Sequence, residues 1–482
     1  MSDLKKAVMT NWRWVMCAML FFATTVNYMD RQVLSLTFKE FIQPEFHWTD
    51  SDYGTITGVF SIAYAIFCLF AGKFIDWMGT KKGYLIAIIV WSLGAVMHAG
   101  CGWVTEQIVG VADKAELLNA TGAIVSSISM VSVWLFLICR LILGLGEAGN
   151  FPAAIKVTAE YFPKKDRAFA TALFNAGASV GALAAPATIP LLAKSLGWEW
   201  AFIIIGALGF IWAGIWIFVY DKPTESKHVN EAELAYINSD ENQITNHQSQ
   251  IINEPQMSFF EAFKHRQTWS FAFGKFMTDG VWWFFLFWAP AYFQDQFGIK
   301  ASDPQGIALI FTLYAIVTVV SLFGGYLPKI FVEKKGMEPY AGRMRAMLIF
   351  AFFPIFALVA QPLGGIWGPW AVAIIIGIVG AAHQSWSANI FSTTGDMFPK
   401  SAVATITGIG AMAGGVGSFL INKGSGMLFD HAAGLGEAFQ FMGFSGKPAG
   451  YMIIFCICAV AYLIGWSVMR ALVPKYSPVV IK

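Results

Sequence analysis

Apolar residues recur along this sequence in runs of roughly 20, each long enough to cross a hydrocarbon core of ~30 Å as a helix. Hydrophobic residues make up 57% of the 482 positions and charged residues 13%, about half the ~25% found in soluble domains. A lipid bilayer is therefore the expected solvent for much of the surface. The runs predict an all-α membrane protein of twelve transmembrane helices, which begin near Trp14, Tyr53, Tyr84, Val131, Ala168, Trp200, Trp269, Ile307, Met347, Trp367, Ala404 and Tyr451.

The first apolar run follows Lys5, Lys6 and Arg13, an arrangement that also occurs in secretory signals. It leads into Asp30 and Arg31 without a small-x-small cleavage motif. We therefore interpret this run as a retained helix.

The distribution of basic residues predicts the orientation of the chain. With both termini in the cytoplasm, 22 of the 32 Lys and Arg residues fall on the cytoplasmic side and 6 fall outside. The positive-inside rule favours this arrangement. We therefore expect a multi-pass protein of the cell inner membrane with both termini cytoplasmic, and two long outside loops at 101–130 and 421–450.

A polar segment, residues 221–266, separates six runs from the other six. We interpret it as a cytoplasmic linker between an N-terminal six-helix bundle, residues 1–220, and a C-terminal six-helix bundle, residues 267–482. Ser258 and Glu261 near its end have the spacing of a capping box, which indicates a short helix unless the spacing is a coincidence.

An internal repeat supports two related bundles. Glu160-Tyr-Phe-Pro-Lys164 after the fourth run returns 236 residues later as Asp396-Met-Phe-Pro-Lys400 after the tenth. The same offset places Gly181 on Gly417 and Glu147 on His383. Transporters with parallel repeated halves bind their substrate between the halves, near the membrane midplane.

Several other classes of protein lack support in the sequence. Six cysteines occur without CxxC or Cys/His spacing, so neither a metal site nor a disulfide framework is indicated. The glycine-rich run from Gly408 to Gly417 lies inside an apolar span, where small residues pack helices together, so we do not interpret it as a nucleotide site. The sequence contains no nucleophile elbow or phosphate loop. We expect no enzyme activity, no cofactor and no nucleic-acid partner.

Ionisable residues inside spans cost at least ~2.5–3.5 kcal/mol each to insert, so each is a candidate functional residue. Asp30 and Arg31 are predicted at the outer end of the first helix. Arg140 and Glu147 are seven residues apart in the fourth run, which corresponds to two turns and roughly 10.5 Å along one helix face. Such a face presents a cation and a titratable acid to one cavity.

The seventh run opens with Lys275 and Asp279, one helical turn apart. The two charges form either a structural ion pair or, through Lys275, a second element that binds a carboxylate. Trp282 and Trp283 follow. They are interpreted either as residues of the membrane interface or as faces that stack on a sugar ring.

The tenth run carries an unusual density of polar side chains, His383-Gln384-Ser-Trp386-Ser387-Ala-Asn389. Polar groups in hydrocarbon need partners, and a polyhydroxylated ligand would supply them. We therefore predict that Gln384, Ser387 and Asn389 contact substrate. The alternative is hydrogen bonding between helices.

Gly72-Lys-Phe-Ile-Asp76-Trp-Met-Gly79-Thr-Lys81-Lys82 joins the second and third runs. It resembles the signature loop of the major facilitator superfamily, in which a basic residue usually occupies the position of Trp77. The corresponding segment of the second half, Gly324-Gly-Tyr-Leu-Pro-Lys329, is a faint copy. We expect the first loop to lock bundle contacts on the cytoplasmic side, or else only to fix topology.

Within that superfamily the sequence resembles the anion:cation symporter branch and its hexuronate transporters. The resemblance extends over most of the chain and is densest at 27–35, 72–82, 140–152, 282–293 and 384–391. One departure concerns the fifth run, which reads Asn175-Ala-Gly-Ala178 where relatives that transport aldonates carry a substrate-contacting glutamine. The resemblance therefore does not extend to a substrate-hydroxyl contact at that position.

The resemblance implies a role for six residues. They are the proton-coupling acids Asp30 and Glu147, the arginines Arg31 and Arg140 that handle negative charge, and Tyr28 and Tyr64, which line a sugar-acid pocket. We therefore expect two bundles that import hexuronate or a related sugar-acid anion together with protons, by alternating access. The alternative is an exchanger of organic phosphates or other anions without net proton movement.

Overall fold

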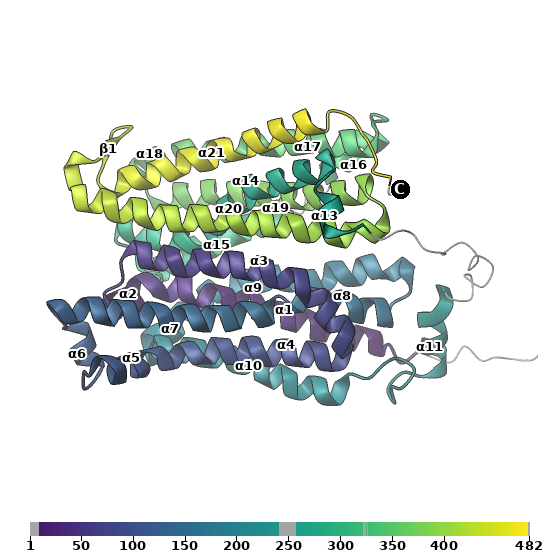
Figure 1. Ribbon diagram of the computed structural model, residues 1–482, viewed down its shortest axis with the longest axis horizontal. Coiled ribbons are helices and arrows are strands. Elements are labelled where there is room, and N and C mark those ends of the chain that lie inside the picture. The colour runs from purple at the N-terminus through teal and green to yellow at the C-terminus, as the bar shows by residue number, and fades with distance from the viewer. Residues whose placement is uncertain (1–8, 241–256, 322–323, 325, 481–482) are drawn as a thin grey trace, which may run out of the picture.

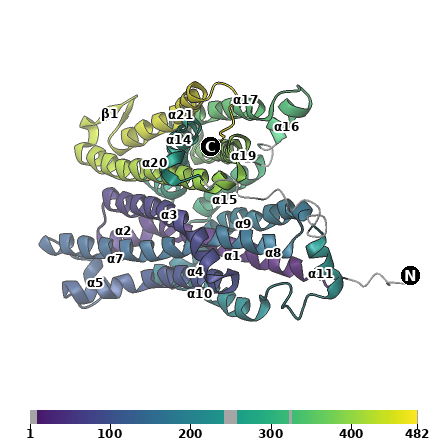
Figure 2. The same ribbon diagram turned by 45° about the vertical axis from the view of Figure 1, so that its right-hand side comes forward.

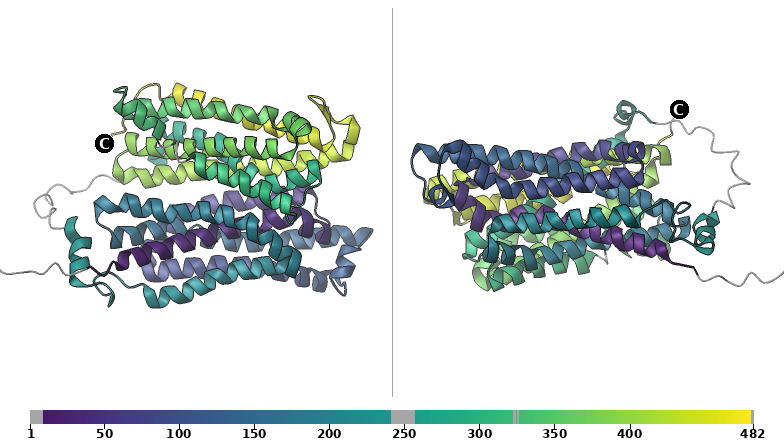
Figure 3. Two further views of the ribbon diagram at one scale, coloured as in Figure 1. Left: turned by 180° about the vertical axis from the view of Figure 1, so that it is seen from behind. Right: turned by 90° about the horizontal axis from the view of Figure 1, so that it is seen from below.

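The computed structural model describes residues 9–240, 257–321, 324 and 326–480, and consists of two helical bundles that lie side by side (Figures 1 and 2). The same two layers are visible from behind in Figure 3. The N-terminal bundle contains α1 (Trp12–Thr37), α3 (Asp50–Met78), α4 (Thr80–Met97), α7 (Ala123–Glu147), α8 (Asn150–Tyr161), α9 (Lys164–Leu196) and α10 (Trp198–Val219).

The C-terminal bundle has a matching set of long helices: α14 (Arg266–Phe297), α15 (Pro304–Ser321), α17 (Pro339–Phe352), α18 (Ala357–Trp367), α19 (Pro369–Met397), α20 (Lys400–Leu435) and α21 (Lys447–Leu472). Shorter elements connect them: a π-helical turn (Phe38–Ile42), α2 (Gln43–Phe46), α5 (Cys101–Val109), α6 (Lys114–Leu118), α11 (Glu231–Ile237), α13 (Phe259–Ala262), α16 (Tyr326–Glu333), and a hairpin of β1 (Gln440–Phe441) and β2 (Phe444–Ser445).

Twelve spans follow from these helices, as the apolar runs predict. Within the described residues, ten are long and apolar enough to cross a membrane. The other two, α1 with 26 residues and α14 with 32, are also long enough. They are less apolar because α1 buries Asp30 and Arg31, and α14 buries Lys275 beside Asp279. The chain is therefore a multi-pass membrane protein.

The internal repeat is visible in the backbone. α8 and α9 are joined through Phe162 and Pro163, and α19 and α20 through Phe398 and Pro399, with the phenylalanine extended and the proline as N-cap in both. Gly181 packs α9 against the main chain of α1, and Gly417 packs α20 against the main chain of α14. A side chain at either glycine would collide with a carbonyl oxygen of the neighbouring helix, so both positions require close approach.

The two long outside loops predicted from sequence are largely helical, which corrects that interpretation. Residues 101–109 form α5, and α20 continues through residue 435 before the β1–β2 hairpin. Both helices extend through polar residues as well as apolar ones. They end at Gly110 and Gly436, both with positive φ.

The short helix predicted from Ser258 and Glu261 is present as α13. The Ser258 hydroxyl accepts a hydrogen bond from the Glu261 main-chain N–H at 3.1 Å. In the loop that resembles the superfamily signature, Asp76 pairs with Lys156 at 2.7 Å and Lys81 with Asp221 at 2.8 Å. These ion pairs join the loop to α8 and to the segment after α10.

One end of the molecule, here called the distal end, carries α2, α5, α6 and the β1–β2 hairpin, and lies opposite the chain termini (Figures 1 and 2). Among the described residues, the ion pairs that join the two bundles all lie at this end. Charge therefore ties the bundles together at the distal end, and the described side chains form no such cross-bundle pair at the opposite end.

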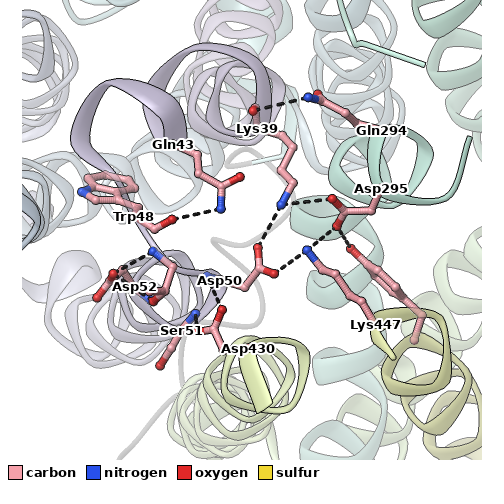
Figure 4. Close-up of polar contacts among 12 residues, drawn as sticks. Lys39, Gln43, Trp48, Asp50, Ser51, Asp52, Gln294, Asp295, Asp430 and Lys447 are labelled. Carbon is pink, nitrogen blue, oxygen red and sulfur yellow. Dashed lines mark hydrogen bonds and ion pairs between the residues drawn. The ribbon is translucent and has the colours of Figure 1, made fainter. Parts of the chain in front are cut away.

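Four of these charges form a ring with two members from each bundle (Figure 4). Lys39 contacts Asp50 of its own bundle at 3.2 Å and Asp295 of the other at 3.1 Å. Lys447 contacts Asp295 of its own bundle at 2.6 Å and also pairs with Asp50. Separation of the bundles here would break the two cross pairs but leave each charge with one partner.

The start of α3 is capped by the other bundle. The Asp430 carboxylate of α20 accepts hydrogen bonds from the main-chain N–H groups of Asp50 at 2.9 Å and Ser51 at 2.7 Å (Figure 4). A carboxylate is favourable there because the first N–H groups of a helix have no partner within it. The nearby Lys423 ammonium donates to the hydroxyls of Ser51 and Thr55.

Outside the spans, α11 caps the start of α1 through Glu233. This buried carboxylate accepts hydrogen bonds from the main-chain N–H groups of Trp12 at 2.9 Å and Arg13 at 3.1 Å, and pairs with the Arg13 guanidinium. Burial by itself raises the pKa of Glu233, but hydrogen bonds from Thr10, Arg13 and Trp12 and the charge of Arg13 bring it below its ordinary value.

Because that pKa is lowered on folding, the ionised Glu233 stabilises the fold above its unfolded pKa of about 4.3, and this stability is lost as the pH falls through the folded pKa. Glu233→Gln is expected to lower the melting temperature at pH 7, by a margin that shrinks towards pH 4. Glu231→Gln, on the exposed side of the same helix, is the control. A margin independent of pH would contradict the assignment.

Asp295→Asn is expected to loosen the distal end, because two lysines then share a single aspartate in a buried site. The measurement is the rate of disulfide formation between cysteines at Glu40 and Ser302, which belong to different bundles and contact one another at 2.7 Å. The background protein has its six cysteines replaced by serine. We expect Asp295→Asn to slow cross-linking severalfold and Glu437→Gln, an exposed distal acid, to leave it unchanged. Equal rates in the two variants would show that the ring does not hold this end together.

Candidate functional site

An ion pair joins α1 and α7 of the N-terminal bundle, where Trp283 of the other bundle also reaches Arg31. The Arg31 guanidinium donates to one Glu147 carboxylate oxygen through Nη2 at 2.7 Å and Nε at 3.1 Å. The Glu147 side chain is fully buried, and that of Arg31 is 6% exposed. Glu147 is the last residue of α7, just before the break that leads into α8. α1 continues six residues past Arg31, to Thr37, so the pair lies within the helix rather than at its outer end.

Aromatic side chains cover the Arg31 guanidinium. Its Cζ atom lies 5.3 Å from the ring centroid of Tyr28, 4.6 Å from that of Tyr64 and 5.2 Å from that of Trp283. Such cation–π contacts strengthen where water is excluded. Tyr28 and Tyr64 are half-buried and belong to the N-terminal bundle, whereas Trp283 comes from α14 of the other bundle.

The other two charges of this cluster have no hydrogen-bonded partner among the described residues. Arg140 is 2% exposed, and both of its terminal nitrogens are buried without an acceptor, although its guanidinium packs over the Phe60 ring at 5.4 Å. Both carboxyl oxygens of Asp30, and the second oxygen of Glu147, are buried without a donor. Buried polar groups are normally paired, so these side chains are exceptions among the described residues.

The structure thus brings six predicted residues together, because α1, α3 and α7 meet at this point. Electrostatic interactions link Asp30 to Arg140 and Glu147, and link Arg31 to Tyr28 and Tyr64. Two acids and two arginines balance in charge, but only one pair is hydrogen-bonded. The arrangement can therefore accept an additional anion at an arginine or a proton at an acid.

In the C-terminal bundle, Lys275 and Asp279 form an ion pair at 2.7 Å, and the Lys275 ammonium lies 4.3 Å from the centre of the Phe391 ring. The lysine side chain is 5% exposed and that of the aspartate 13%. The structure therefore contains the ion pair that the sequence offered as one of two interpretations. Lys275 would be available to an anion only if Asp279 released it.

The polar residues of α19 point to different partners. His383, the repeat counterpart of Glu147, bonds through Nδ1 to the Tyr462 hydroxyl at 2.7 Å and stacks on Trp282, so it contacts its own bundle. Asn389 is buried and donates to the Ser385 carbonyl at 2.8 Å, within the helix. Gln384 and Ser387 are half-buried.

Sequence reasoning missed one member of the cluster, Phe60, and named Trp283 only together with Trp282, as a residue of the membrane interface or a face that stacks on a sugar ring. Phe60 lies one helical turn before Tyr64, and this spacing alone would have placed it on the same face of α3. No such signal separates Trp283 from Trp282. Within the described ranges, no group of three or more His, Cys, Asp or Glu side chains is placed to hold a metal ion.

Comparison with known proteins gives consistent matches. The sequence model of the Major Facilitator Superfamily matches residues 20–421. The hexuronate transporter of Escherichia coli strain K12 is 27% identical over 95% of this chain and 94% of its own length. The galacturonate transporter of Dickeya chrysanthemi is 28% identical over 66% of this chain and 82% of its own length. A crystal structure of a bacterial homologue of the human lysosomal transporter Spinster, inward-facing and unoccupied, superimposes with a TM-score of 0.68 at 17% identity, covering 97% of this chain and 99% of that one.

Arg31→Met is expected to lower the melting temperature of the purified protein more than Arg140→Met. The first change leaves Glu147 without its hydrogen-bonded partner, a loss of about 3–5 kcal/mol for a buried pair. The second removes a guanidinium whose terminal nitrogens have no hydrogen bond to lose. Glu147→Gln added to Arg31→Met should restore part of the loss, since no charge then stays unpaired. Equal destabilisation by the two arginine variants would contradict the assignment of Arg31 as the paired arginine and Arg140 as the one without a hydrogen-bonded partner.

Proposed function

Because this chain belongs to the Major Facilitator Superfamily, we propose that it is a proton-coupled symporter that imports hexuronate or a related sugar-acid anion by alternating access. The observation that carries the proposal is the buried Arg31–Glu147 ion pair beside the unpaired Asp30 and Arg140. The similar hexuronate and galacturonate transporters support the class of substrate.

In this proposal the substrate carboxylate competes with Glu147 for Arg31. The planar guanidinium holds a carboxylate through two parallel N–H donors, and Glu147 now occupies two of these donors with one oxygen. When the substrate takes its place, Glu147 loses its counter-charge inside an apolar site. A carboxylate left alone there is neutralised by a proton, so arrival of the anion brings a proton with it.

Asp30 is the second proposed proton carrier. Its carboxyl is 2% exposed and has no hydrogen-bond donor among the described residues, a setting that favours the neutral acid. It also interacts electrostatically with Glu147 and Arg140. Charge on one acid is therefore felt by the other, and Arg140 provides a second cation for the substrate.

The remaining substrate contacts are proposed from both bundles. Tyr28 and Tyr64 would line the pocket around the carboxylate. Hydroxyl groups of the substrate would meet Gln384, Ser387 and Asn389 on α19, with Lys275 as a third cation once Asp279 releases it. A site divided between the bundles suits alternating access, because bound substrate draws the two halves together.

We propose that the distal end faces outside and that both termini are cytoplasmic, in the cell inner membrane. The excess of Lys and Arg at the opposite end supports this orientation. Since the cross-bundle ion pairs gather at the distal end, the closed side would then be the outer one. In this conformation the site would be open towards the cytoplasm and would release substrate there.

An exchanger of organic phosphates or other anions without net proton movement is the rival function. In an exchanger of this kind, we would expect several arginines directed at a dianion. Here one arginine is already neutralised by an acid, and a second acid lies beside the other arginine, which favours proton coupling. The two functions differ in their response to an imposed pH gradient.

Glu147→Gln is expected to bind and exchange glucuronate but to lose accumulation against a gradient, because the amide mimics the protonated acid permanently. The measurement compares counterflow with uptake driven by a pH gradient in the same proteoliposomes. Glu45→Gln, which changes a buried acid held by Trp198 and Lys114 away from the cluster, should keep both activities. A Glu147→Gln protein that still concentrates glucuronate would remove Glu147 from coupling. Native protein indifferent to the pH gradient would favour the exchanger.

A further inference from the structure

Trp283 extends from α14 of the C-terminal bundle onto the charged cluster of the N-terminal bundle. Its ring centroid lies 5.2 Å from the Arg31 guanidinium carbon, 6.2 Å from the Tyr64 ring and 6.1 Å from the Phe60 ring. It is half-buried, so part of the indole stays accessible. Trp283 therefore forms a wall of the site that is supplied by the opposite bundle.

The neighbouring tryptophan does not share this position. Trp282 stacks on His383 with parallel rings whose centroids are 5.4 Å apart, inside the C-terminal bundle. Its ring also lies against Gly380 of α19. The aromatic pair that looked equivalent in sequence is thus divided between packing within one bundle and contact across the two.

The Arg31 guanidinium has two kinds of surface, and they are used differently. Its N–H groups, which lie in the plane, meet the Glu147 carboxylate, while aromatic rings surround it within cation–π distance. A substrate carboxylate that replaces Glu147 must also approach along the plane of the N–H groups. The rest of the substrate then extends beside the aromatic wall of Tyr64 and Trp283.

In a pyranose uronate the carboxylate is bonded directly to a ring carbon. When Arg31 holds the carboxylate, the sugar ring is therefore one bond away and has little freedom to leave the wall. One face of such a ring presents several C–H groups and is apolar enough to pack on an aromatic face. The indole is the largest flat surface available at this position.

We infer that Trp283 is a specificity-determining residue, which selects sugar acids in the pyranose form over open-chain sugar acids by stacking on the ring. This inference rests on the proposed function and narrows its substrate class. An open-chain aldonate carries the same carboxylate but no rigid apolar face. It would have to order several rotatable bonds to cover the indole, and the entropy lost in doing so offsets much of the free energy gained from the contact.

The test measures how much glucuronate, galacturonate, gluconate or galactonate is needed to halve counterflow of labelled glucuronate in proteoliposomes. Trp283→Leu keeps an apolar side chain but removes the flat aromatic face. We expect it to weaken the two uronates about five- to tenfold, the size of an aromatic stacking term. The two open-chain acids should change by less than about twofold, so the preference for ring forms collapses.

Trp283→Phe, which keeps a smaller aromatic face, should retain most of the preference and gives a reading even if the leucine variant does not fold. Trp282→Leu, one residue away, is the matched control and should leave the ratio of uronate to aldonate affinities unchanged. Equal weakening of uronate and aldonate binding in the Trp283 variants would overturn this inference and leave the proposed function standing. A shift of the affinity ratio in Trp282→Leu would do the same. If native protein neither binds nor exchanges any uronate, the proposed function fails and the inference fails with it.

Discussion

The buried ion pair of Arg31 and Glu147 is the interaction on which the other charged side chains around it depend. Inside a bundle surrounded by lipid, a charge has neither water nor a high dielectric around it, so it needs a partner or a proton. Pairing of these two residues fixes α1 against the end of α7 and leaves Asp30 and Arg140 beside them unsatisfied. The site therefore holds one hydrogen-bonded pair and two charges without a hydrogen-bonded partner among the described residues.

The same requirement acts differently at the distal end. There, Lys39, Asp50, Asp295 and Lys447 form a ring in which each charge has a partner in its own bundle and another across the interface. Separation of the bundles at this end would therefore leave no charge of the ring alone. In the central cluster, by contrast, Asp30 and the terminal nitrogens of Arg140 have no hydrogen-bond partner among the described residues.

The two bundles repeat one backbone plan but divide the chemistry unequally. Gly181 and Gly417 perform the same packing task in the two halves, whereas Glu147 and its counterpart His383 do not resemble one another in surroundings or partners. The N-terminal bundle holds the arginines and acids. The C-terminal bundle adds Trp283, the half-buried polar residues of α19 and its own ion pair of Lys275 and Asp279.

The sequence by itself determined the twelve helices, their two bundles and which charged residues lie inside the spans, because hydrocarbon forces every span to satisfy its own backbone and makes each buried charge conspicuous. Only the tertiary structure decided which charges meet. Glu147 pairs with Arg31, 116 residues away, and not with Arg140 two turns earlier on its own helix. Trp283, not Trp282, reaches the cluster, and residues expected in loops extend the helices. These outcomes depend on how helices distant in sequence approach and rotate against one another, which local periodicity does not encode.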